Sequence, residues 1–173
     1  MKYCSKCGSN DIKHEIPQDD HRLRNVCSNC NSVFYENPRI VVGTIPVFNN
    51  KILLAKRGIE PQIGKWNLPA GFLEVNESIE HGARRETIEE TGAEISELIL
   101  HTMFQANSNH LYIFYLAKLE SDKNNTTVES TEIEFFDLDN IPWNDLAFTS
   151  NNFALKSYID AESSSQNIYF ASE

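Results

Sequence analysis

Alternating and continuous apolar runs predict most of the β-structure of this chain. The runs at residues 39–48 and 51–56 flank Asn49-Asn50, and together they predict a β-hairpin with a two-residue turn. Apolar positions at residues 97–104, 110–118 and 132–136 predict three further strands. Residues 121–130 are mostly polar and are expected to form a loop.

Helices are predicted in three places. The longest follows Asn76, the expected N-cap, and ends before Gly92, the expected stop. A short helix is expected at residues 142–147, and another at residues 151–159 with apolar packing residues. A helix between strands and a second one near the end predict an α/β (α+β) domain, an α/β/α sandwich around a mixed sheet.

A junction at Asn37-Pro38 separates a small N-terminal module from the main domain. We expect a module at residues 1–35, a domain at residues 36–162, and a frayed Ser/Gln/Asn-rich tail at residues 163–173. The module contains two Cys-x2-Cys pairs, made of Cys4, Cys7, Cys27 and Cys30. Their spacing predicts a tetrahedral Cys4 zinc site in a zinc ribbon, with positive φ at Gly8 in the first turn. Two disulfides or a redox-active pair are the alternatives. An intracellular chain disfavours the disulfides, and the lack of a strand–helix context after either motif disfavours the redox-active pair.

Charge is unevenly distributed along the chain, whose net charge is −10. Residues 1–35 carry five Lys/Arg against four Asp/Glu, whereas residues 36–173 carry ten against 21. The main domain therefore repels polyanions, and nucleic acid is not expected as a partner. No apolar run approaches the roughly 18 residues of a membrane span, and the start lacks a signal-peptide core, so a soluble, cytoplasmic protein without a membrane partner is expected.

Acidic residues concentrate between residues 71 and 92, around one glycine turn and the helix that follows. The five carboxylates are Glu74, Glu77, Glu86, Glu89 and Glu90. The last three are spaced i, i+3 and i+4 and share one helix face. Such carboxylates repel one another unless a divalent cation sits among them, so the pattern predicts a hard-metal site beside a phosphate-bearing substrate. A solvated acidic helix face is the alternative. Arg85 can pair with Glu89 and reach back to Glu77.

The same segment resembles the Nudix box, G-x5-E-x7-R-E-U-x-E-E-x-G-U, in which U is a bulky apolar residue. All seven fixed letters are matched, by Gly71, Glu77, Arg85, Glu86, Glu89, Glu90 and Gly92. Thr87 and Ala93 depart from the U positions, and both changes concern packing. The preceding Trp66-Asn-Leu-Pro-Ala-Gly-Phe-Leu-Glu74 is similar to the family's W-x-L-P-G-G-x-x-E approach, with Ala70 where the first glycine often stands.

The resemblance implies hydrolysis of a nucleoside diphosphate linked to another moiety, with Mg²⁺ or Mn²⁺ as cofactor. It implies metal ligation by Glu86 and Glu90, assisted by Glu89 and the backbone carbonyl of Ala70. Glu77 is assigned to holding Arg85. The carboxylate that takes the proton of the attacking water is either Glu89 or a residue beyond the box.

Two residues beyond the box, Glu132 and Glu134, are candidates for that proton acceptor, with Glu132 ranked first; either could instead be a surface residue. Arg57 could contact phosphate or pair with an acid. Four aromatic residues, Phe104, Tyr112, Phe114 and Tyr115, offer stacking faces. Aromatic residues that alternate on a strand belong more often to the core, so none of them is placed in the site.

The residues that flank the box bear on the identity of the substrate. A zinc ribbon ahead of a Nudix domain is shared by NADH pyrophosphatases and by a second group similar to FAD and ADP-ribose pyrophosphatases. Residues 104–110 lack the Ser-Gln-Pro-Trp-Pro-Phe-Pro-like array of the first group, and residues 141–158 look closer to the second. We therefore expect a small nucleotide substrate, FAD or ADP-ribose, cleaved to AMP and a second phosphomonoester. Relatives also imply a homodimer.

Three alternatives to this function are kept. The substrate could be NADH, or it could be a nucleoside triphosphate or capped RNA. The chain could also be a catalytically silent zinc-ribbon adaptor, although every expected metal ligand is present.

Overall fold

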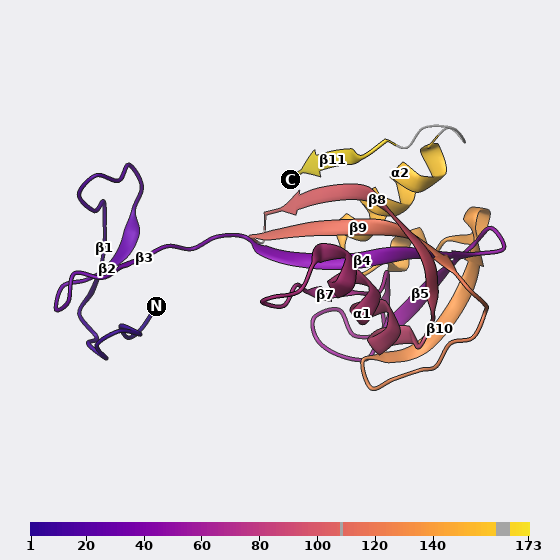
Figure 1. Cartoon of the computed structure of the whole chain (residues 1–173), viewed down its shortest axis with the longest axis horizontal. Helices are drawn as coiled ribbons and strands as arrows, with labels where there is room; N and C mark the ends of the chain where they lie inside the picture. Colours follow the sequence, from indigo (N-terminus) through magenta and orange to yellow (C-terminus); the bar gives the residue numbers. More distant parts are fainter. Residues whose placement is uncertain (108, 162–166) are drawn as a thin grey trace. The chain divides into compact units, whose positions relative to one another are not determined.

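The computed structural model describes residues 1–107, 109–161 and 167–173, and its elements are labelled in Figure 1. The chain divides into two compact units, Met1–Asn37 and Pro38–Glu173. The division falls two residues after the expected end of the N-terminal module.

The first unit is a three-stranded antiparallel sheet of β1 (Ile12–Glu15), β2 (Arg24–Cys27) and β3 (Val33–Phe34). Each cysteine pair is followed by a residue of positive φ, Gly8 at 76° and Asn31 at 55°. The N–H groups of these two residues donate to the carbonyls of Cys4 and Cys27, at 2.9 and 2.8 Å. The positive φ expected at Gly8 is therefore confirmed, and the second pair repeats the same turn with an asparagine, which tolerates this conformation.

The second unit consists of a mixed sheet and two α-helices. The described strands are β4 (Arg39–Phe48), β5 (Lys51–Arg57), β6 (Trp66–Asn67), β7 (Ala70–Phe72), β8 (Ile95–Ala106), β9 (His110–Leu119), β10 (Ser130–Asp137) and β11 (Tyr169–Ser172). The helices are α1 (Ile79–Thr91) and α2 (Thr149–Asp160), and 3₁₀ turns occur at Leu138–Asn140 and Trp143–Asp145. The strand order is β10-β5-β4-β9-β8-β11, with β6 beside β5 and β7 beside β4.

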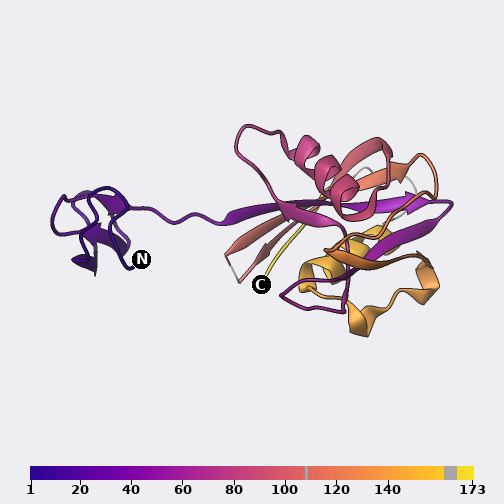
Figure 2. The same cartoon turned by 90° about the horizontal axis from the view of Figure 1, so that it is seen from below.

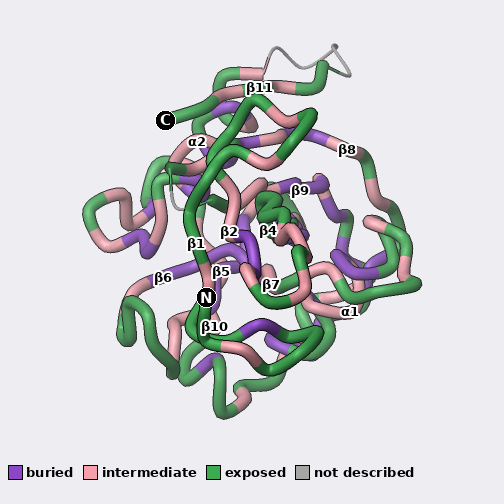
Figure 3. The backbone as a smooth tube through the Cα atoms, turned by 90° about the vertical axis from the view of Figure 1, so that its left-hand side faces the viewer, coloured by how far each residue is buried: buried purple, intermediate pink, exposed green. Residues whose placement is uncertain are grey.

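The two helices cover opposite faces of this sheet (Figure 2). On one face, Ala154 and Leu155 of α2 pack against a cluster that includes Ile45 and Phe114. On the other face, Ala83 of α1 packs against Val42, Ile113 and Tyr115. Buried residues concentrate in the central strands (Figure 3). The predicted α/β/α sandwich around a mixed sheet is confirmed.

The hairpin of β4 and β5 turns at Asn49 and Asn50, whose φ angles are 49° and 62°. Positive φ at both central residues is what a type I′ turn requires, and asparagine adopts it more readily than other non-glycine residues. The strands pair at Val47 with Ile52 and at Phe48 with Lys51. The predicted hairpin is therefore confirmed with its expected turn.

Thr87 accounts for one departure from the Nudix pattern. It is fully buried on α1, and its hydroxyl lies 2.7 Å from the hydroxyl of Thr44 on β4. The Thr87 hydroxyl also donates to the carbonyl of Ala83, at 2.9 Å. A polar pair thus replaces an apolar contact between helix and sheet.

Three local predictions are wrong. The N-cap of α1 is Ser78, whose hydroxyl accepts from the N–H of His81, and not Asn76, which has a φ of 71° in the preceding turn. The expected helix at residues 142–147 is only a 3₁₀ turn, Trp143–Asp145, because the chain turns too soon to form a further helical bond. The tail is not frayed over Tyr169–Ser172, which pairs in parallel with β8 as β11. Residues 163–166 of that tail lie outside the described residues.

Neither of the described α-helices combines the length and the apolar character needed to span a membrane.

Candidate active site

Arg85, in the middle of α1, is the centre of an ionic network. Its guanidinium donates two hydrogen bonds to the Glu77 carboxylate, at 2.7 and 3.1 Å. It also donates to Glu86 at 2.6 Å, to Glu89 at 3.0 Å and to the carbonyl of Phe72 at 3.1 Å. Both contacts expected of Arg85, with Glu77 and with Glu89, are present. The network ties the loop after β7 to the helix.

Glu77 is ionised over the whole working range of pH. The hydrogen bonds from Arg85 lower the pKa of its carboxyl group to about 2, with help from the N–H of Glu74. The side chain is mostly covered, with 10% of its surface exposed. Glu77 is therefore held as a fixed partner of Arg85, and its geometry suits a positioning role.

Glu90 is the most buried of the three carboxylates that share one face of α1. It is 9% exposed, and one oxygen accepts from the N–H of Ala70 at 3.2 Å. Burial, with smaller contributions from the charges of Glu86 and Glu129, raises the pKa of Glu90 to about 8; the hydrogen bond from the N–H of Ala70 and the charge of Arg57 oppose this shift. A buried carboxylate of this kind gains most from a nearby cation.

Glu86 is pressed against the backbone of β7. A Cβ added at Gly71 would lie 2.3 Å from three atoms of the Glu86 carboxyl group. Only glycine allows this approach. Burial raises the pKa of Glu86, and the neighbouring Arg85 opposes that change. Glu86 and Glu90 thus flank the Ala70–Gly71 backbone.

The donor set at this point fits a hard divalent cation, which prefers carboxylate and carbonyl oxygens. Burial disfavours the charge of Glu86 and Glu90, and a divalent cation would restore it. Glu89 is more remote, since its side chain is 59% exposed. Among the residues that the structure describes, these carboxylates are spread more widely than the cysteine sulfurs, all of which lie within 4.8 Å of one another.

Glu132 lies apart from this carboxylate group. Its side chain is half exposed and accepts a hydrogen bond from Lys56 at 2.8 Å. That bond, with the charges of Asp145 and Glu134, raises the pKa of Lys56. Glu132 and Glu134 therefore belong to a separate ionic cluster around Lys56.

Glu129 lies near the carboxylates of α1, a relation that the sequence did not reveal. It stands one residue before β10, and its charge raises the pKa of both Glu86 and Glu90. Its carbonyl accepts from the N–H of Gly58 at 2.8 Å, which anchors the loop end beside β5. The sequence shows only a polar loop there, with nothing to separate this glutamate from its neighbours.

A cavity of about 500 Å³ opens beside Ala70 and Gly71. Its lining includes Tyr112 and Phe114, which the sequence assigned to the core. The stacked rings of these two residues are 6.3 Å apart at an angle of 9°. The alternation of residues along a strand could not reveal that these rings line a cavity, because one face of a strand can border a cavity at one point and pack in the core at another. Phe104 and Tyr115 are buried as expected.

Arg57 also lines the cavity. Its Nε donates to the carbonyl of Pro61 at 2.7 Å, and its guanidinium lies 5.1 Å from the centre of the Phe148 ring. The charge of Arg57 lowers the pKa of Glu90. Arg57 therefore lies near both Glu90 and the ring of Phe148.

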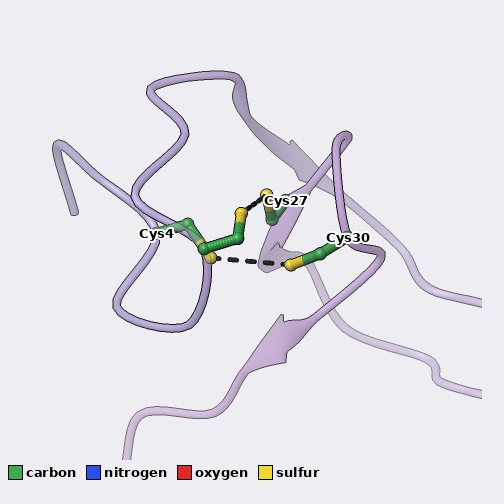
Figure 4. A group of neighbouring side chains, drawn as sticks. Cys4, Cys27 and Cys30 are labelled. Atoms are coloured by element: carbon green, nitrogen blue, oxygen red, sulfur yellow. Dashed lines mark hydrogen bonds between the residues drawn. The ribbon is translucent and has the colours of Figure 1, made fainter.

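The four cysteines form a second site in the first unit (Figure 4). All are free thiols, and the sulfur of Cys4 lies 3.7 Å from that of Cys30, and that of Cys7 lies 3.6 Å from that of Cys27. Tetrahedral zinc with bonds of about 2.3 Å separates its sulfurs by about 3.8 Å. The arrangement therefore fits zinc and has no disulfide, as the spacing predicted.

Two family models match the chain. Residues 37–158 match the NUDIX domain, and residues 2–36 match a zinc-ribbon model described as Nudix N-terminal. A solved structure, a NUDIX hydrolase from Nitrosomonas europaea, is 38% identical with a TM-score of 0.90, and the match covers all of both chains.

Curated relatives are matched over shorter segments. The NAD-capped RNA hydrolase NudC of Haemophilus influenzae is 34% identical over 137 residues, which is 76% of this chain and 48% of the relative. The ADP-ribose pyrophosphatase of Methanocaldococcus jannaschii is 32% identical over 113 residues, which is 62% of this chain and 67% of the relative. The chain thus spans about half the length of the NudC relative.

Proposed function

The chain belongs to the NUDIX family, and we propose that it hydrolyses the pyrophosphate bond of an ADP-containing molecule, ADP-ribose or FAD. The products would be AMP and a second phosphomonoester. The observation that carries this proposal is the position of Glu86 and Glu90. They flank the Ala70–Gly71 backbone at one end of a cavity whose volume and aromatic lining suit a nucleoside.

Each residue of the network has a proposed task. Glu86 and Glu90, with Glu89 and the Ala70 carbonyl, hold Mg²⁺ or Mn²⁺, which supplies charge neutralisation at the phosphates and an activated water. Arg85, fixed by Glu77, sets the position of the Glu86 carboxylate. Arg57 stands where it can contact a phosphate oxygen.

The proton of the attacking water needs an acceptor. We favour Glu129 over Glu132, because Glu129 lies close enough to influence both Glu86 and Glu90, whereas Glu132 is paired with Lys56. Glu89, whose side chain is exposed, remains the candidate within the box. Replacing Glu129 by Gln should reduce kcat, while Glu132→Gln should not.

A substrate panel tests the function. ADP-ribose, FAD, NADH, ATP and NAD-capped RNA are incubated with Mg²⁺, and the products are separated by chromatography. We expect AMP from ADP-ribose or FAD, and no turnover by Glu90→Gln, which removes charge and leaves the fold intact. Absence of turnover on the whole panel by the folded protein would support a silent adaptor, and a preference for ATP would contradict the proposed substrate class.

NAD-capped RNA is the second candidate, because the matched NudC relatives carry that name. Residues 36–173 contain 21 acidic and ten basic residues, and this negative charge weighs against a long RNA partner. Free NADH and the capped RNA in the panel separate these substrates, since only RNA binding should weaken strongly with salt.

Two further features are part of the proposal. Zinc occupies the Cys4 site, where it is structural because four thiolates leave no open position. The protein forms a homodimer, which would cover exposed apolar residues such as Phe170 on the edge strand β11. Metal analysis and light scattering test these two points.

A further inference from the structure

The deepest part of the cavity contains a pair of asparagine side chains. Asn67 of β6 and Asn151 of α2 both line the cavity and are 4% and 1% exposed. Nδ2 of Asn151 donates to Oδ1 of Asn67 at 2.7 Å. The pair is held in place by the chain around it, because the N–H of Ala147 donates to the carbonyl of Trp66 at 2.8 Å.

The pair has unused hydrogen-bonding capacity. Over the described residues, the bond between the two amides is the one side-chain bond that either makes. The remaining amide atoms are not among the side-chain atoms that are sealed from solvent without a partner. They therefore face the cavity. Whichever way the two amides are oriented, the pair leaves one donor group and one acceptor for a ligand.

The surroundings favour a flat, neutral ring at this depth. Phe114 is 1% exposed, and Tyr112 and Phe148 complete an apolar lining around the amides. The charged lining residues, Arg39 and Arg57, are less buried. Ala70 and Gly71 line the same cavity, so phosphates near the carboxylates and a ring near the amides fit one ligand.

We propose that Asn67 and Asn151 form a base-recognition pair that binds the amino edge of adenine. Adenine carries an exocyclic amino donor next to a ring-nitrogen acceptor, which is the edge that a carboxamide recognises through two hydrogen bonds. This inference rests on the proposed function, because it assigns the adenine of the ADP-containing substrate to the cavity.

Binding of mononucleotides tests the pair in the native protein. Calorimetry with Mg²⁺ compares AMP with purine riboside 5′-monophosphate, which lacks the exocyclic amino group. We expect AMP to bind about 5- to 150-fold more tightly, the range for one well-placed pair of base contacts. Equal affinities, within about twofold, would overturn the proposal. Tighter binding of nicotinamide mononucleotide than of AMP would also overturn it, since the pair would then recognise a carboxamide.

An isosteric substitution separates recognition from a structural role. In Asn151→Asp the ionised carboxylate cannot donate, so the bond is kept with the Asn67 amide turned over and its Nδ2 as the donor. The pair then presents two acceptors, which match the two adjacent N–H donors of guanine. In mildly alkaline buffer, where the carboxylate is ionised, the preference for AMP over GMP should shift toward GMP by about tenfold or more. Asn152→Asp, on the next residue of α2 and outside the cavity lining, is the matched control and should leave the preference unchanged. An unchanged preference in a folded Asn151→Asp protein would refute the pair.

Failure of this inference can be distinguished from failure of the proposed function. Turnover of ADP-ribose without a preference for AMP would refute only the base-recognition pair. A preference for AMP without turnover of any pyrophosphate would refute only the catalytic proposal. If Asn151→Asp does not fold, the comparison of the two purine nucleotides with the native protein still decides.

Discussion

Replacing Gly71 by alanine would displace the carboxylate of Glu86 in the proposed metal site. The added methyl carbon would lie 2.3 Å from the carboxyl carbon and both oxygens of Glu86, and these are its three nearest heavy atoms. Gly71 is not among the residues of positive φ, so alanine fits its backbone. Ordinary van der Waals contact begins at about 3.4 Å. The Glu86 carboxylate must therefore move by about 1 Å.

A displacement of this size should affect catalysis more than folding. Misplacing a catalytic group by about 1 Å can cost about 100-fold in rate, which corresponds to about 2.7 kcal/mol of transition-state stabilisation. Folding loses at most the hydrogen bond between Arg85 and Glu86, a contribution of about 1 kcal/mol at a partly exposed site. The two effects can be measured separately.

The assay compares kcat/KM for the preferred substrate over a Mg²⁺ titration, together with the melting temperature. Gly71→Ala should need more Mg²⁺ and lose about 100-fold in kcat/KM with little change in melting. Val75→Ala, at an 87% exposed position in the turn after β7, is the control and should behave as the native protein. Native activity and native Mg²⁺ dependence in Gly71→Ala would show that the position of the Glu86 carboxylate does not matter, and would refute its role as a metal ligand.

Three further predictions concern stability. Thr87→Val should destabilise the protein by about 1–3 kcal/mol in urea unfolding, because it leaves the buried Thr44 hydroxyl without its partner. Adding Thr44→Val should recover most of the loss, and additive losses in the double variant would contradict this reasoning. His101 is 3% exposed, and its burial lowers its pKa to about 4, so as the pH falls the histidine is protonated in the unfolded state before it is protonated in the folded state. The free energy of unfolding should therefore fall by up to about 3 kcal/mol as the pH drops from 6.5 to 4, and by less in His101→Leu. Removing zinc with a strong chelator should unfold residues 1–37 alone, seen as hydrogen exchange confined to that unit; protection that persists there would argue against a metal-dependent fold.

Some features of the site follow from short stretches of sequence. The i, i+3, i+4 spacing places Glu86, Glu89 and Glu90 on one side of α1, and Arg85 reaches Glu77 within eight residues. Helix geometry fixes the first relation, because 3.6 residues complete each turn; Glu77 precedes α1 and is held by its hydrogen bonds with Arg85. The Asn49-Asn50 turn and the two cysteine turns are local in the same sense, since each depends on the backbone preferences of two to four residues.

Other features depend on which distant segments pack together. Glu129 joins Glu86 and Glu90 across a loop, and Asn67 meets Asn151 although 84 residues separate them. The choice of Ser78 over Asn76 as N-cap was also tertiary, because Arg85 and Glu77 fix the path of the preceding loop. Neither the residue type nor the local hydrophobic pattern distinguishes these positions from ordinary surface positions.

The sequence by itself determined the chemistry of this protein, namely its carboxylate helix, its thiol pairs and the family to which it belongs. Tertiary structure alone decided which faces line the cavity and which glutamate approaches the carboxylates. Local patterns depend on the few backbone angles between neighbouring residues, whereas a cavity is formed by strands and helices that meet only when the whole sheet has assembled.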